Sequence, residues 1–151
     1  HMDIYQDPYI IPTFIDNHDM GRFLASGDVA GLKQALATIF TIPGIPTIYQ
    51  GTAQAMTESR QAMFKGGFKA ERDYFDQQSE LYKFIKQLAK LRTGDKLFTS
   101  GELTMIAANK TGPGLLAYTR EYQGRTVLVM FNTSRHNILI NDIQVAGQAL
   151  R

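Results

Sequence analysis

Apolar residues in the N-terminal half of the chain form short continuous runs and one stretch with helical spacing. The runs at 10–15 and 45–49 are short enough for single buried strands. Between them, apolar residues recur every three or four positions, and Asp28 can cap a helix over 29–41 that must end before Pro43. Strand, helix and strand within about forty residues predict a parallel βαβ unit.

The middle of the chain combines a long polar segment with a second helical pattern. Residues 50–75 are rich in glycine, polar and charged residues without a period, which predicts a long loop of functional or disordered character. A helix is expected over 78–92, ended by Gly94, because its apolar residues share one face: Leu81, Phe84, Ile85, Leu88 and Leu91. We interpret this face as core packing.

After Gly94 the pattern changes to β-rich runs separated by turn residues. These runs cover 103–108, 115–122, 126–131 and 138–140. The intervening sequences contain Asn-Lys-Thr-Gly-Pro-Gly, Gln-Gly and Asn-Thr-Ser-Arg-His-Asn, which favour turns. An antiparallel sheet is therefore expected in the C-terminal third, with a boundary near Gly94.

Composition limits the classes of function. The chain has 151 residues, of which 44% are hydrophobic, so it can build a packed core. Sixteen basic and fourteen acidic side chains are interspersed, and the net charge of +2 argues against nucleic acid as a partner. The sequence contains no run of 18 apolar residues, so it predicts no membrane-spanning helix. The absence of cysteine excludes disulfides and thiolate metal sites but leaves the compartment undetermined, with secretion or periplasmic export both open.

The candidate chemistry follows the first apolar run, where Asp16, Asn17, His18 and Asp19 are consecutive and Arg22 comes soon after. Catalytic residues in barrel enzymes lie at the carboxyl ends of strands. The alternatives are an ordinary polar turn with a surface histidine, or a metal site made by Asp16, His18 and Asp19. Adjacent residues of a strand point to opposite faces, so these three side chains do not easily converge on one ion.

Two stretches resemble the α-amylase family, glycoside hydrolase family 13. The sequence Phe-Ile-Asp-Asn-His-Asp at 14–19 is similar to the fourth signature region of that family, and 36–51 is similar to the following helix, Pro-Gly-Ile-Pro turn and eighth strand. The resemblance implies an α+β chain. Residues 3–94 would be the last two strand–helix units, a C-terminal βαβα remnant of a (β/α)8 barrel. Residues 95–151 would be an incomplete antiparallel β-sandwich domain.

The resemblance also implies roles for the polar turn. Asp19 would be the carboxylate that stabilises the transition state of a retaining glycoside hydrolase acting on α-glucans, and His18 would donate a hydrogen bond to the same sugar. Asn17 and Arg22 are weaker candidates for substrate binding, and Arg22 could equally form a salt bridge at the rim. No cofactor or metal is expected; the family allows calcium in a longer enzyme, but no site is identifiable here.

Two catalytic groups of that family have no counterpart in the sequence. Its nucleophile and general acid lie in earlier signature regions, and nothing here matches them, so we expect this chain to be inactive alone. Ala53 also stands where the family often carries glutamate after the eighth strand. Alternatives are a non-catalytic carbohydrate-binding or structural module, or an unrelated small protein sharing the motif by chance.

Further expectations concern partners. The aromatic residues of the 50–75 loop could stack on sugars, but we favour their anchoring the loop to the core: Phe64, Phe68, Tyr74 and Phe75. Parallel strands taken from a barrel would leave both edges unpaired, which predicts self-association through those edges. Neither nucleic acid nor a membrane is an expected partner.

Overall fold

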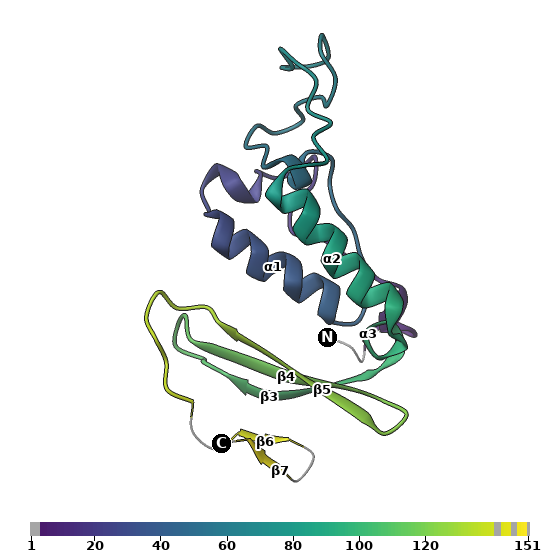
Figure 1. Ribbon diagram of the computed structural model, residues 1–151, viewed down its shortest axis with the longest axis vertical. Helices are drawn as coiled ribbons and strands as arrows, with labels where there is room; N and C mark the ends of the chain where they lie inside the picture. Colours follow the sequence, from purple (N-terminus) through teal and green to yellow (C-terminus); the bar gives the residue numbers. More distant parts are fainter. Residues whose placement is uncertain (1–3, 141–142, 146–147, 151) are drawn as a thin grey trace.

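The computed structural model describes residues 4–140, 143–145 and 148–150, which form an α+β structure (Figure 1). Helices α1 (Val29–Thr41) and α2 (Glu80–Gly94) lie side by side above an antiparallel sheet. The loop that joins β2 to α2 projects from the end of the helical layer farthest from the sheet (Figure 1). The chain therefore has a helical layer, a sheet beneath it and one long protruding loop.

Both predicted helices are confirmed, and local sequence explains where they begin. Asp28 caps α1, its Oδ1 accepting a hydrogen bond from the Gly31 amide at 2.7 Å. Ser79 caps α2 through a 3.1 Å bond from the Tyr82 amide, so α2 begins two residues later than predicted. The apolar faces of the helices meet in a core of Leu32, Leu36, Ile39, Phe40, Leu81 and Leu88. Each such buried side chain contributes roughly 1.5–3 kcal/mol of hydrophobic stabilisation.

The predicted parallel strand pair exists but is much shorter than the apolar runs suggested. Strands β1 (Pro12–Thr13) and β2 (Ile45–Pro46) pair in parallel, whereas 10–15 and 45–49 were predicted as strands. A proline in each strand removes a ladder donor, and within the described residues no third strand pairs with either one. Gly44, at φ +117°, allows the close approach, because a Cβ there would lie 2.8 Å from the Ile11 carbonyl oxygen.

The antiparallel sheet is confirmed with boundaries within one residue of the prediction. Strands β3 (Glu102–Ala108), β4 (Leu115–Tyr122) and β5 (Arg125–Asn132) pair in the order β3-β4-β5. Gln123 and Gly124 connect β4 to β5 with φ angles of +51° and +76°. Positive φ at both central residues is what a two-residue hairpin turn of type I′ requires.

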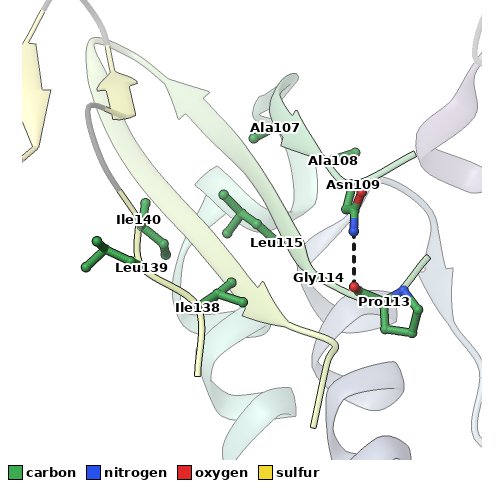
Figure 2. A pocket seen from close by; sticks show the side chains of 9 residues that line it. All are labelled: Ala107, Ala108, Asn109, Pro113, Gly114, Leu115, Ile138, Leu139 and Ile140. Carbon is green, nitrogen blue, oxygen red and sulfur yellow. Dashed lines mark hydrogen bonds between the residues drawn. The ribbon is translucent and has the colours of Figure 1, made fainter. Parts of the chain in front are cut away.

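The prediction of a strand at 138–140 is wrong. These residues form no ladder, and Leu139 is 88% exposed. Residues 138–140 line an open cavity of about 380 Å³ beside the sheet, and Leu115 of the sheet lines it as well (Figure 2). The final pair of strands is instead β6 (Ile143–Val145) and β7 (Gln148–Leu150), which form a separate two-stranded sheet. An apolar triplet predicts burial, but a strand also needs a neighbour with free backbone groups.

Two buried arginines bind backbone carbonyls around the C-terminus of α1, and Arg120 thereby joins the helical layer to the sheet. Arg120 on β4 is 0% exposed and donates to the carbonyls of Thr41 and Gly101. Arg92 on α2 donates to the carbonyls of Phe40, Ile42 and Gly44. The last carbonyls of a helix lack partners within the helix and carry partial negative charge, so cations are favoured there. Burial lowers the pKa of both guanidinium groups.

The short helix α3 (Lys96–Ser100) starts directly at the boundary that the sequence predicted near Gly94. Asp95 caps it by accepting a 3.0 Å hydrogen bond from the Leu97 amide. That bond and the neighbouring Arg125 guanidinium lower the pKa of Asp95. Leu97 and Phe98 are buried, so the connection between the helices and the sheet is itself part of the packed structure. The division into 3–94 and 95–151 stays a prediction.

Candidate functional site

The polar turn after β1 begins with a buried carboxylate. Asp16 is 4% exposed, and its Oδ1 accepts a hydrogen bond from the Thr52 hydroxyl at 3.0 Å. Its Oδ2 accepts from the Phe23 amide at 3.2 Å, at the start of the 3-10 helix Phe23–Ala25. Asp16 therefore ties both sides of the turn to the residues after β2, and its carboxylate is not available to a ligand.

His18 and Asp19 are presented to solvent. Their side chains are 67% and 68% exposed, and His18 Nε2 lies 3.2 Å from Asp19 Oδ2. Asn17 is half-buried, and its Oδ1 accepts a 2.8 Å hydrogen bond from the Asp19 amide. This is an Asx turn, in which the asparagine side chain shapes the backbone. The structure thus brings His18 and Asp19 together as accessible groups and gives Asn17 a bond within the turn.

Arg22, predicted as a weaker substrate-binding residue, is 2% exposed and surrounded by protein. Its Nε donates to the Glu58 carbonyl at 3.2 Å, and its Nη1 donates to the Thr52 hydroxyl at 3.4 Å. The guanidinium carbon lies 4.1 Å from the centre of the Tyr49 ring, a cation–π contact. Among the described residues no carboxylate forms a salt bridge with Arg22, so a rim salt bridge is not what the structure contains.

Thr52 connects the two buried charges of the site. Its hydroxyl donates to Asp16 and accepts from Arg22, so one side chain links an anion to a cation. Thr52 begins the 3-10 helix Thr52–Gln54, which also contains Ala53. The Ala53 carbonyl accepts a 2.6 Å hydrogen bond from Ser79, the cap of α2. The residues after β2 are therefore fixed between the polar turn and the start of α2.

No feature of the sequence selects Arg60, yet it contacts the two exposed site residues. Its Nε donates to the His18 carbonyl at 2.8 Å, and its Nη2 lies 3.3 Å from Asp19 Oδ1. A single arginine in a long polar loop carries no local signal, and about forty residues separate it from the turn. Only the folded loop shows this pairing.

The loop that carries Arg60 has its own internal bonds and an exposed aromatic surface. Lys69 binds Glu58 Oε2 at 2.7 Å and thereby lowers the pKa of that carboxyl. Phe64, Phe68 and Phe75 are exposed, so the interpretation that they anchor the loop to the core is wrong for these three. Tyr74 is half-buried, and its hydroxyl accepts from Gln61 at 3.2 Å. Backbone hydrogen bonds within the loop, from Ala62 to Phe68 and from Tyr74 to Met63, also help to order it.

The described residues contain no group of three side chains placed to hold a metal ion. The trio considered from the sequence is separated by burial, because Asp16 points inward while His18 and Asp19 are exposed. Within the same part of the chain, no helix is both long and apolar enough to cross a membrane.

Comparisons with known proteins identify the family. No family model matches the chain. It is 37% identical over 123 residues to a cyclomaltodextrin glucanotransferase from Paenibacillus macerans, covering 81% of this chain and 16% of that protein. It is 33% identical over 136 residues to an α-amylase from Niallia circulans, covering 89% and 24%. The structure superposes on the γ-cyclomaltodextrin glucanotransferase of alkalophilic Bacillus clarkii with a TM-score of 0.77 and 30% identity, covering 96% and 21%.

These similarities place the chain among the glycoside hydrolases and their relatives. It belongs to the α-amylase family, glycoside hydrolase family 13, as the two sequence motifs indicated. The chain spans less than a quarter of the length of each of these three relatives.

Proposed function

We propose that this chain is the C-terminal segment of an α-amylase-type retaining glycoside hydrolase acting on α-glucans such as starch and maltodextrin. In this proposal 3–94 is the remnant of a (β/α)8 barrel and 95–151 is part of a β-sandwich domain. The observation that carries it is the exposed Asp19–His18 pair in the polar turn that follows the parallel strand β1, within a motif of this family. The names of the relatives support α-glucans as the substrate class.

The proposed role of Asp19 follows from the charge that develops during glycoside cleavage. Retaining hydrolysis passes through an oxocarbenium-like transition state between two carboxyl groups. Asp19 would be a third carboxylate that accepts hydrogen bonds from sugar hydroxyls, and interactions that strengthen in the transition state raise kcat. His18 would donate a hydrogen bond to the same sugar. Asn17 and Arg22 would support substrate binding as weaker contributors.

The chain alone is expected to release no reducing ends from soluble starch. The chain lacks a nucleophile and a general acid. General acid–base catalysis alone typically raises the rate by about 10²–10⁴-fold. A reducing-end assay on the purified chain tests this, and an Asp19→Asn variant purified identically is the control. Turnover that persists through every purification step of the unsubstituted chain and disappears in the Asp19→Asn variant would contradict the proposal of an inactive segment.

A second candidate function is non-catalytic carbohydrate binding, which the exposed Phe64, Phe68 and Phe75 favour. Aromatic faces suit the apolar faces of pyranose rings. Calorimetric titration with maltoheptaose separates the two functions. Binding that is lost in Phe68→Ala but kept in Asp19→Asn would favour a binding module, whereas binding that is unchanged in Phe68→Ala would count against it.

We also propose that the chain self-associates through the β1–β2 pair. Ile10, Phe14 and Ile45 are exposed beside these strands, and their burial against a second copy would remove apolar surface from water. Light scattering over a range of concentrations should show a mass that rises above that of a monomer. An Ile45→Lys variant should stay monomeric over the same range. A monomeric parent chain at every concentration would exclude this proposal.

A further inference from the structure

Three consecutive residues of the long loop each contact the turn that carries Asp19. The Glu58 carbonyl accepts a 3.2 Å hydrogen bond from Arg22. Ser59 Oγ donates to the Met20 carbonyl at 3.1 Å. Arg60 reaches both His18 and Asp19. The segment 58–60 thus contacts His18, Asp19, Met20 and Arg22, four of the five residues of the turn from 18 to 22.

The segment 58–60 is itself held from both sides. Lys69 binds the Glu58 carboxylate at 2.7 Å, and Gln61, the next residue after Arg60, donates to the Lys69 carbonyl at 2.8 Å. The Gln61 carbonyl in turn accepts from Gln50, just after β2. The segment is therefore connected to the loop beyond it and to the strand region before it, so its contacts to the turn are made from a fixed position.

Arg60 adopts a conformation that its side chain does not favour. Its φ is +60°, in the left-handed region that non-glycine residues rarely occupy. Such a conformation is unfavourable by itself and persists where surrounding interactions over-determine it. Here the guanidinium fork binds two acceptors at once, a backbone carbonyl at 2.8 Å and a carboxylate at 3.3 Å. Lysine could not reproduce this fork, because it presents a single charged point.

From these observations we infer that Glu58, Ser59 and Arg60 form a clamp on the turn, in which Arg60 is a positioning residue for the Asp19 carboxylate. The inference rests on the proposed function of Asp19 and adds a device that fixes its orientation. Arg60 acts through Asp19: its Nε–H holds the His18 carbonyl while its Nη2 holds the carboxylate. A carboxylate held in place before substrate arrives needs less reorganisation in the transition state.

The kinetic test uses the longer enzyme that contains this segment, with maltoheptaose as the substrate. Arg60→Ala is expected to lower kcat about 10- to 100-fold with a smaller change in KM, since one charge-assisted contact to the carboxylate is lost. Arg60→Lys should recover part of kcat. In an Asp19→Asn background, Arg60→Ala should change kcat by less than about threefold, because the two residues act as one unit. Equal effects of Arg60→Ala in both backgrounds would overturn the inference.

Arg72→Ala is the matched control, since Arg72 is in the same loop but its guanidinium carbon lies 5.2 Å from the centre of the Tyr74 ring. This variant loses the same charge and should keep kcat within about twofold. A fall as large as that of Arg60→Ala would show a general charge effect and would overturn the inference.

A second measurement on the 151-residue chain separates this inference from the proposed function. If the longer enzyme shows no activity on α-glucans, the proposed function fails and the clamp is judged by the exchange rate of the Asp19 amide in NMR. That amide donates to Asn17 Oδ1, so it reports on the turn. Arg60→Ala should raise its exchange at least severalfold, while Arg72→Ala should not. Unchanged exchange in Arg60→Ala would overturn the clamp.

Discussion

Replacing Asp19 by Asn in the longer enzyme is expected to lower kcat by about 10²–10³-fold, the usual cost of removing one group that stabilises charge in a transition state. KM should change much less, because the contact matters most after the sugar has distorted. Asparagine retains the size of the side chain but loses the negative charge beside the developing cation. Steady-state kinetics on maltoheptaose measures both constants.

The neighbouring histidine provides the control for this experiment. His18→Ala removes one or two hydrogen bonds to the sugar, worth about 1–3 kcal/mol. Its effect on kcat/KM should therefore be smaller than that of Asp19→Asn. An Asp19→Asn enzyme with near-normal kcat would show that the role assigned to this motif is wrong.

Replacing Arg120 by Met is expected to destabilise the chain by about 1–3 kcal/mol, the cost of leaving one buried polar group unsatisfied. The substitution keeps an unbranched apolar stem but leaves the Thr41 carbonyl without the donor that Arg120 supplies. The Gly101 carbonyl also loses Arg120 but keeps its hydrogen bond from the Tyr9 hydroxyl. Each buried polar group left unsatisfied costs about 1–3 kcal/mol. Removing the buried cation offsets part of this cost, because the desolvation of an ion is itself unfavourable. Urea denaturation followed by circular dichroism gives the change in the free energy of unfolding.

Arg125→Met is the matched control because Arg125 is an exposed arginine on the adjacent strand β5. Its guanidinium binds Asp95 Oδ2 at 2.9 Å at the surface. Exposed pairs of this kind typically contribute about 0–1 kcal/mol. If Arg120→Met and Arg125→Met lowered stability equally, the buried arginine would have no special part in joining the helices to the sheet.

The elements of regular structure were predictable where the sequence carried a local period. The spacing of Leu32, Leu36, Ile39 and Phe40, with Asp28 before them, defined α1 to its exact bounds. The β4–β5 hairpin was equally clear, since Gln123-Gly124 between two β-rich runs specifies its turn. These signals are reliable because a helix cap and a two-residue turn are made by neighbours in the chain. The same is true of the motif at 14–19, which indicated the family by its residues alone.

The failures occurred where a partner distant in the sequence was decisive. The apolar triplet Ile138–Ile140 has the composition of a strand but no strand to pair with. Conversely, the runs at 10–15 and 45–49 pair over only two residues each, because the number of ladder bonds depends on neighbouring strands and on Pro12 and Pro46. Hydrophobic pattern reports burial preference, whereas pairing is a property of two segments.

The sequence by itself determined which residues could carry chemistry, and the tertiary structure decided which of them are presented. Asp16 and Asp19 are three residues apart and chemically identical, yet one is buried against Thr52 and the other is exposed beside His18. Arg22, selected from the sequence, lies inside the protein, whereas Arg60, which carries no sequence signal, contacts Asp19. The physical reason is that a charged side chain is stabilised by partners in space. Those partners, Thr52, Glu58 and Arg60, come from a loop that folds back over about forty residues of chain.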